Sequence, residues 1–183
     1  MAGHDHDGRP AGLPTRYQLV DVLGRGGSAT AYLARDTRLG TDVVVKVLDR
    51  PGPADDRFDA EVRALGRLRD VPGVVRLEAV GRSDTGVPWL VEALAPGGSL
   101  ADRLRRGLLG PPQVAVLVAS LATTLAAAHR RGVHHGDVSP GNVVLDVDGA
   151  VLVCDFGVAA LAGAPTGGPG PVTPSFAAPE RRT

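Results

Sequence analysis

The chain has 183 residues, which allows one domain or one and a half and is long enough to bury a hydrophobic core. Its 20 Lys+Arg residues balance 20 Asp+Glu residues without blocks of like charge, so nucleic acid and anionic membranes are poor candidates as partners. The one cysteine, Cys154, excludes an internal disulfide and disfavours a disulfide-stapled secreted scaffold. We therefore expect a cytoplasmic protein that binds a discrete ligand.

The N-terminal residues 1–14 are predicted to form a disordered tail. They contain no apolar stretch of the kind that a signal peptide needs. The longest uncharged stretch, Val114–Ala128, is short for a bilayer span and is diluted by Ala, Ser and Thr. The sequence therefore predicts no membrane segment in this chain.

Strand-like segments dominate the first half of the chain. Alternating and apolar runs bounded by turn residues predict strands at 17–23, 30–34, 43–48, 74–80 and 87–93. One helix is predicted between the third and fourth strands, at 54–69, where Phe58, Val62 and Leu65 form an apolar stripe. Glu61 lies on the buried side of this helix, or else at the fringe of the stripe with its carboxylate in water.

A glycine-rich turn, Leu23–Ala31, joins the first two strands. Its glycines let backbone amides approach an anion closely and tolerate positive φ. Hairpin loops also use glycine for purely conformational reasons. The turn alone therefore leaves both readings open.

Lys46 is the only lysine, since every other cationic position is arginine. It interrupts an apolar strand, and a strand of this kind does not usually carry a charge unless a partner awaits it. A compact ammonium differs from a planar guanidinium in what it can bind, and phosphate is the partner we favour. A lysine at a strand edge that reaches water is the alternative.

The second half of the chain is mainly helical at first. A short helix is predicted from Ser99, a suitable N-cap, to Arg106, and a long one from Pro112 to Arg131. Two short strands follow at 143–145 and 151–154, joined by an Asp-Gly hairpin turn. Residues 162–174 are predicted to form a loop.

Three polar residues near these short strands suit a Mg²⁺–phosphate centre. Asp137 is suited to accept a hydroxyl proton, while Asn142 and Asp155 offer the hard oxygen ligands that Mg²⁺ prefers. Taken singly, Asp and Asn are also ordinary turn residues. Their order along the chain favours the phosphate centre.

The chain resembles the eukaryotic-like protein kinases, specifically the bacterial Hanks-type serine/threonine kinases. The resemblance runs from Tyr17 to Glu180 and rests on six motifs in the same order. These are the glycine-rich turn, Lys46, Glu61, the loop His135–Asn142, the triplet Asp155-Phe156-Gly157 and the triplet Ala178-Pro179-Glu180.

The resemblance implies ATP and Mg²⁺ as cofactors and a role for each matched residue. Lys46 would grip the α- and β-phosphates and be held by Glu61, and Asp137 would orient the substrate hydroxyl. Asn142 and Asp155 would hold Mg²⁺. The remaining nucleotide-binding positions would be Leu23, Gly24, Gly26, Gly27 and Ala31.

Several positions depart from the family pattern. Gly136 stands where many kinases have an arginine that answers a phosphate on the activation loop, so activity should depend little on phosphorylation of Thr166 or Thr173. Ser139 replaces a lysine that faces the γ-phosphate. Gapless alignment puts Glu92 at the gatekeeper position, where an unpaired charge would be costly, so we expect a local shift of one residue.

The resemblance implies an α+β, bilobal kinase-like fold. The N-lobe, at 15–94, would hold a five-stranded antiparallel sheet and one helix, and 95–183 would form an incomplete, mostly helical C-lobe. The helices that normally follow Glu180 are missing, so we expect a truncated chain whose long helix is covered by a partner or a missing segment.

The activity implied is ATP-dependent phosphorylation of an unidentified protein substrate at serine or threonine. A pseudokinase or inactive nucleotide-binding fragment is the main alternative, supported by Ser139, by Ala29 in place of the third glycine of the turn, and by the missing helices. A small-molecule phosphotransferase of the aminoglycoside-kinase type is the other. The stretch Thr173–Glu180 resembles the end of a protein-kinase activation segment and speaks against that last reading.

Overall fold

The computed structural model describes residues 10, 12–26, 29–49, 55–83, 85–156 and 176, with the side chains of 55–58 and 61 left out. These residues divide into two compact units. The first unit holds residues up to 62 and the segment 76–94, and the second holds 63–75 and 95–156.

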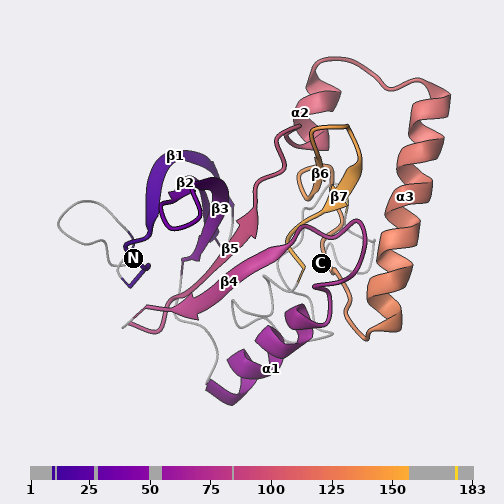
Figure 1. Cartoon of the computed structure of the whole chain (residues 1–183). Helices are drawn as coiled ribbons and strands as arrows, with labels where there is room; N and C mark the ends of the chain where they lie inside the picture. The colour runs from indigo at the N-terminus through magenta and orange to yellow at the C-terminus, as the bar shows by residue number, and fades with distance from the viewer. Residues whose placement is uncertain are drawn as a thin grey trace. The chain divides into compact units, whose positions relative to one another are not determined.

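The first unit is built on a five-stranded antiparallel sheet in the order β1-β2-β3-β5-β4 (Figure 1). Its strands are β1 (Tyr17–Arg25), β2 (Ala29–Asp36), β3 (Thr41–Leu48), β4 (Leu77–Arg82) and β5 (Pro88–Ala93). Consecutive strands pair as hairpins in β1–β2–β3 and in β4–β5, and β3 pairs with β5 to join the two groups. The five-stranded antiparallel sheet expected from the sequence is confirmed.

The two faces of this sheet carry different residues, because successive side chains of a strand point to opposite faces. Val43, Val45 and Val47 of β3 lie with Trp89 and Val91 of β5 in one buried apolar cluster. The cluster also includes Leu13, Tyr17, Tyr32 and Ala34. The even-numbered residues of β3 therefore point to the opposite face, and that face is the one that carries Lys46.

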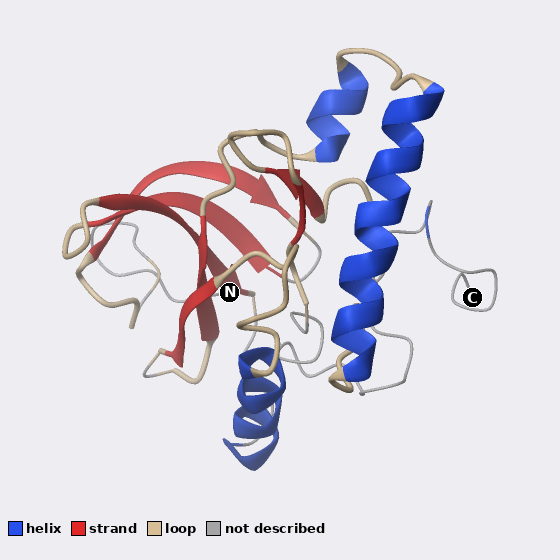
Figure 2. Cartoon of the chain, turned by 45° about the vertical axis from the view of Figure 1, so that its right-hand side comes forward, coloured by secondary structure: helices blue, strands red, loops and turns tan. Residues whose placement is uncertain are grey.

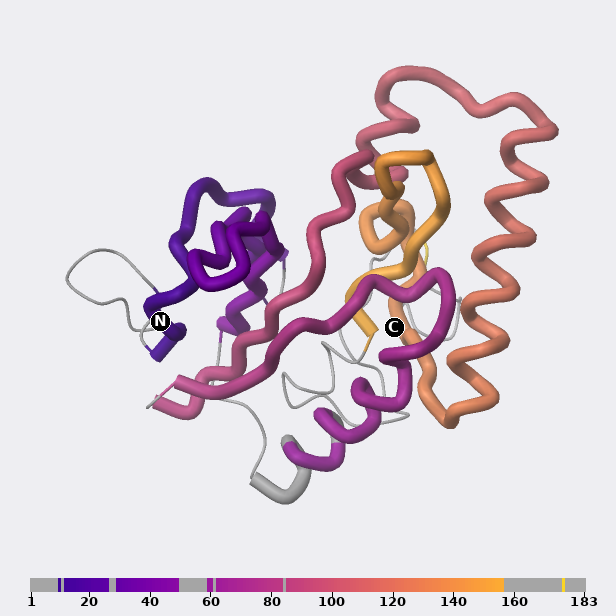
Figure 3. Tube along the Cα trace, in the orientation of Figure 1, coloured from indigo at the N-terminus to yellow at the C-terminus, as the bar shows by residue number. Residues whose placement is uncertain are grey.

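The fourth strand begins later than the sequence predicts. The expected strand at 74–80 is observed at Leu77–Arg82, paired beside β5 (Figure 3). Val74 instead forms a parallel bridge with Val153, and the Val75 amide donates to the Val153 carbonyl at 2.9 Å. The apolar run 74–80 therefore serves two units, and periodicity alone could not divide it.

Helix α1 (Asp55–Gly66) is shorter than the predicted 54–69 and contains the division between the units. After Gly66 the chain continues in turns closed by bonds three residues apart, such as the Leu68 amide to the Leu65 carbonyl at 2.9 Å. Leu65 and Leu68 are both buried. The apolar pattern thus extends beyond the helix into the turn that follows it.

The second unit contains α2 (Leu100–Arg105), α3 (Pro111–Arg130) and the hairpin of β6 (Val143–Leu145) and β7 (Val151–Val153), shown by type in Figure 2. Ser99 begins α2 with a capping box, in which its hydroxyl accepts from the Asp102 amide at 3.1 Å. Within this unit β6 contacts α2 and β7 contacts α3. All four elements match their predicted positions to within one residue.

Helix α3 is the longer and more apolar of the two helices α2 and α3. Its buried residues are Thr124 and Ala128, whereas Val114, Val116 and Val118 are exposed within this chain. By length and composition this 20-residue helix could cross a membrane, a test that core helices of other proteins also pass. The expected absence of a membrane segment therefore stays a prediction.

Candidate functional site

The glycine-rich turn is a tight hairpin at its described positions. The Gly26 amide donates to the Ala29 carbonyl at 2.9 Å, and Gly24 pairs with Ala31 across β1 and β2. Leu23 falls in a register shift between Val22 and Gly24 and is 52% exposed. Gly27 lies outside the described residues.

Cross-strand register brings several predicted nucleotide-binding positions into one row. Gly24 lies opposite Ala31, Ala31 opposite Lys46, and Lys46 opposite Leu90. Cross-strand partners share a face of the sheet, so this row lies on the face opposite the apolar cluster. A side chain added at Gly24 would meet no atom within 4 Å. The sheet surface is therefore open at the Gly24 end of this row, whereas Lys46 and Leu90 are buried.

Lys46 is held by a carboxylate of the same sheet. Its Nζ lies 2.7 Å from Oε2 of Glu92 on β5, and the two side chains are only 9% and 10% exposed. In the antiparallel register Glu92 lies opposite Val44, two residues from Lys46 and on the same face. Lys46 is therefore a buried, paired ammonium and not a lysine that reaches into water.

Two expectations from the sequence concern this pair: the one-residue shift at Glu92 and the pairing of Lys46 with Glu61. An unpaired charge at this position would be costly, but Lys46 supplies the partner, so the reason to expect a one-residue shift disappears. The register irregularity of this strand pair lies on β4, between Leu77 and Ala79. Glu61, the predicted partner of Lys46, is on α1, but its side chain lies outside the described residues.

Glu92 is the site residue that sequence reasoning did not assign. The signal was present, because Glu92 is the one charged residue in the strand Pro88–Ala93. Its partner could not be read from the chain, because the two residues are 46 positions apart and meet only through the pairing of β3 with β5.

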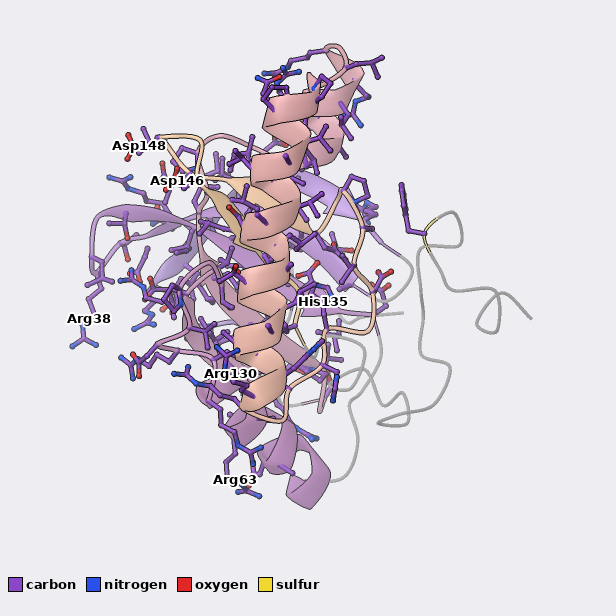
Figure 4. All side chains as sticks on the ribbon, turned by 90° about the vertical axis from the view of Figure 1, so that its right-hand side faces the viewer. Arg38, Arg63, Arg130, His135, Asp146 and Asp148 are labelled. Atoms are coloured by element: carbon purple, nitrogen blue, oxygen red, sulfur yellow. The ribbon has the colours of Figure 1, made fainter. Side chains whose placement is uncertain are left out.

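In the second unit, His135 organises the loop that leads to β6 (labelled in Figure 4). Its Nδ1 accepts from the Asp137 amide at 3.2 Å, and its Nε2 lies 2.8 Å from the Cys154 carbonyl. Because Nδ1 accepts and the carbonyl can only accept, this pattern assigns the ring proton to Nε2. The ring also packs on Phe156 at a centroid distance of 4.7 Å. His135 thus ties the loop before β6 to the segment after β7.

Asn142 fixes Asp137 from within the same loop. Its Nδ2 donates to the Asp137 carbonyl at 2.8 Å and to the Asp137 carboxylate at 3.3 Å. Since the amide nitrogen is occupied by these bonds, the Oδ1 of Asn142 is the atom of that side chain suited to accept a cation. The Cys154 amide donates to the Asn142 carbonyl at 3.0 Å, which places Asn142 beside the residue before Asp155.

Two residues of this region have left-handed backbones. Asp155 has φ 67°, the one non-glycine residue with positive φ in the described part of the chain, and Gly136 has φ 83°. Asp tolerates this region better than most residues, and such conformations concentrate at functional sites. At Gly136 the missing side chain removes the strain that an arginine would carry there. Gly157, Thr166, Thr173 and the triplet 178–180 lie outside the described residues.

The residues of the second unit fit a magnesium ion through oxygen donors. The described residues hold no group of three or more His, Cys, Asp or Glu side chains that could bind a metal by themselves. An amide oxygen and a carboxylate, with phosphate oxygens and water completing the shell, are nevertheless the ligands Mg²⁺ usually takes. Cys154 is a free cysteine and is buried, which favours a packing role over a reactive thiol.

Comparisons with known proteins identify the family to which the chain belongs. Residues 17–182 match the family model described as protein kinase domain. The chain is 36% identical over 158 residues to serine/threonine-protein kinase PknB of Mycobacterium leprae, covering 82% of this chain and 25% of that protein. It is 40% identical over 157 residues to the DNA damage-responsive serine/threonine-protein kinase RqkA of Deinococcus radiodurans, covering 81% and 23%.

A solved structure has a similar fold. The kinase domain of Mycobacterium tuberculosis PknI superposes with a TM-score of 0.63 at 29% identity, covering 85% of this chain and 69% of that one. The chain spans about a quarter of the length of the two curated relatives. Because the family model matches nearly the whole of this chain, the chain belongs to the protein kinase domain family.

Proposed function

We propose that this chain transfers the γ-phosphate of ATP to serine and threonine hydroxyls of proteins. Membership of the family supports the kinase reaction, and the names of the relatives support protein hydroxyls as acceptors. Because the chain spans about a quarter of those relatives, the activity of the whole protein is part of the proposal. We take residues 15–94 as the N-lobe and 95–183 as the C-lobe.

The first unit would bind the nucleotide phosphates. Lys46 is a buried ammonium on a sheet face that also carries Gly24 and Ala31, and a side chain added at Gly24 would meet no atom within 4 Å. An ammonium is a compact point charge with three donors, so it can keep a carboxylate partner and still bind phosphate oxygens. Leu23, Gly26 and Gly27 would complete the nucleotide contacts, with Glu61 as a second support for Lys46.

The second unit would bind the metal and the acceptor hydroxyl. Mg²⁺–ATP, when bound, supplies the phosphoryl group and the cation that neutralises its charge. Asn142 and Asp155 would hold that cation, and Asp137 would orient the hydroxyl and take up its proton. The observation that carries the proposal is the bond from Asn142 Nδ2 to Asp137, because it fixes the proposed base and leaves the amide oxygen of the same side chain as the atom that would hold the cation.

The test measures transfer of labelled γ-phosphate from Mg²⁺–ATP by the purified chain, to itself and to mixed serine- and threonine-containing peptides. The informative variant is Lys46→Arg, which keeps a charge for Glu92 but replaces the compact ammonium by a planar guanidinium. We expect transfer by the wild type and a loss of about 100-fold or more in Lys46→Arg. Equal rates in the two proteins contradict the proposal.

Other activities give other outcomes in the same assay. Ser139 is buried and replaces the lysine expected beside the γ-phosphate, which favours a nucleotide-binding protein without transfer as the second candidate. ATP-dependent thermal stabilisation without label on protein indicates that candidate. Label on a hydroxylated metabolite but on no protein indicates a small-molecule phosphotransferase.

A further inference from the structure

Lys46 and Glu92 form a buried ion pair, whereas the pair of Arg35 and Asp42 in the same sheet is about half exposed. The side chains of the buried pair are 9% and 10% exposed, and their neighbours Val45, Leu90 and Val91 are fully or almost fully buried. A buried ion pair generally gives no more stability than well-packed apolar residues of the same volume, because both charges lose their hydration. Packing alone therefore does not explain why this sheet keeps the pair.

The geometry of the pair is set by the backbone. β3 and β5 are neighbouring strands with continuous register from Val43 to Val47, and Glu92 lies diagonal to Lys46 on the same face. The carboxylate accepts at 2.7 Å, a normal length for a charge-assisted bond. Glu92 is one partner of Lys46 and does not account for all of its interactions. The support that Glu92 gives to Lys46 comes from within the sheet.

We propose that Glu92 is a positioning residue that holds the Lys46 ammonium in place for the phosphates of a nucleotide. The inference rests on the proposed function, because it takes Lys46 as the phosphate-binding cation. One N–H of the ammonium is directed to Glu92, which fixes where the other two N–H groups point. Removing the Glu92 charge takes away one of the contacts that hold the buried ammonium, and we expect part of the preference for phosphate to be lost.

The alternative role of Glu92 is competition, in which its carboxylate keeps Lys46 away from phosphate. The two roles predict opposite changes in phosphate binding when the carboxylate is removed. A positioning carboxylate makes phosphate binding weaker when it is removed, and a competing carboxylate makes phosphate binding stronger. The rigid placement of both residues on paired strands favours positioning.

The experiment compares ATP with adenosine by isothermal titration calorimetry on the full 183-residue chain with Mg²⁺. The ratio of the two affinities isolates the phosphate contribution, and damage to the fold would lower both affinities together. In Glu92→Gln, which keeps a hydrogen-bonding side chain without charge, we expect the ratio to fall about tenfold while the adenosine affinity stays within about twofold. In the Lys46→Met background the same change no longer lowers the ratio.

A matched control is available on the same strand. Asp42 of β3 pairs with Arg35 of β2 at 2.8 Å, but both side chains are about half exposed. Asp42→Asn removes one carboxylate from the same sheet and should leave the ratio unchanged. If Glu92→Gln does not fold, Glu92→Asp replaces it, because it keeps the charge but withdraws the carboxylate by one methylene. It should lower the ratio in the same direction.

The outcomes separate the two proposals. An unchanged or increased ATP preference in Glu92→Gln, or in Glu92→Asp where that variant replaces it, overturns the positioning role while leaving the proposed kinase function standing. A wild-type chain that does not prefer ATP over adenosine overturns the proposed function and the positioning role together. A fall in the ratio that persists in the Lys46→Met background also contradicts the inference, since Glu92 would then act without Lys46.

Discussion

The two units hold their proposed chemical groups in different ways. In the first unit, Lys46 and Glu92 are paired side chains on neighbouring strands, far apart in sequence and buried together. In the second unit, Asp137 and Asn142 lie five residues apart on one loop and are fixed mainly by bonds to backbone atoms. Sheet register thus builds one half of the chemistry, and local loop bonding builds the other.

This difference predicts how substitutions affect stability and activity in each unit. A buried ion pair is costly to break because the remaining charge has no hydration, so the first unit couples its chemistry to its stability. A loop held through backbone carbonyls and amides keeps its shape when one carboxylate becomes an amide. The second unit should therefore lose chemistry without losing fold.

The largest expected effect is on catalysis in the second unit. Asp137→Asn keeps the size of the side chain and its backbone bond to His135 but removes the proposed base. We expect phosphoryl transfer to fall by about 1,000-fold, in the range typical of general-base loss, while ATP affinity stays unchanged. Initial rates with labelled ATP and calorimetric ATP binding measure the two quantities.

The control for this change is Asp148→Asn, an exposed carboxylate in the β6–β7 turn of the same unit (labelled in Figure 4). It should leave both transfer and ATP affinity as in the wild type. A large loss in the free energy of unfolding of Asp137→Asn, measured by urea unfolding, would show that the second unit, like the first, couples its chemistry to its stability, and the contrast between the units would fail.

The next effect is on stability in the first unit. Lys46→Met leaves Glu92 buried without its ammonium, and we expect a loss of about 3 kcal/mol in the free energy of unfolding. In the double variant Lys46→Met, Glu92→Met most of this loss should be recovered, because an apolar pair fills the same space without a charge. Urea unfolding measures all three proteins.

The exposed pair of Arg35 and Asp42 is the matched control, since Arg35→Ala should cost about 1 kcal/mol or less. A double variant no more stable than Lys46→Met would show that the pair supports the sheet in its own right. A positioning role for Glu92 would then no longer be needed to explain why the pair is kept.

The sequence predicted the elements of both units far better than it predicted the partners of Lys46. Strand and helix periods placed β3, α2, α3, β6 and β7 closely, because each is a local pattern with clear turn or cap residues. The loop residues Asp137 and Asn142 were also found, because they lie close together in the chain. Their proposed roles stay predictions.

What the sequence could not give depends on contacts between distant segments. The run 74–80 reads as one strand, yet Val74 and Val75 bond to Val153 and only the residues from Leu77 join the sheet. The importance of Glu92 was missed for the same reason, since strand order is not encoded in any local pattern. Both features depend on which strands are neighbours in the fold, and the sequence alone does not show this.

A smaller stability effect tests how closely Gly97 packs against the backbone at the end of β6 in the second unit. A side chain at Gly97 would lie 2.7 Å from the backbone oxygens of both Leu145 and Asp146, and backbone cannot move aside as a side chain can. We expect Gly97→Ala to cost about 2 kcal/mol, measured by urea unfolding. Gly66→Ala, where no atom lies within 4 Å, is the control and should be neutral or slightly stabilising. Equal effects of the two changes would show that the backbone around Gly97 can move to make room for a methyl group.

The smallest effect concerns the cap of α2 and its dependence on pH. The Ser99 hydroxyl and amide both hydrogen-bond to the Asp102 carboxylate, which lowers the pKa of that carboxyl below its usual value. Ser99→Ala removes the cap, and we expect a cost of about 1 kcal/mol at neutral pH.

The sign of the pH dependence follows from the lowered pKa. A carboxyl whose pKa is lower in the folded chain stabilises the fold above its unfolded pKa, about 4, and this contribution is lost as the pH falls through the folded value. The cost of Ser99→Ala should therefore shrink in acid, as measured by thermal unfolding from pH 7 to pH 3. The Thr123 hydroxyl of α3 bonds to the Ala119 carbonyl and to no carboxylate in the structure, so the effect of Thr123→Ala on stability should not change with pH. A cost of Ser99→Ala that is equally large at both ends of the range would mean that the hydroxyl acts on the Asp102 amide alone, and the charge of the carboxylate would contribute nothing to this helix start.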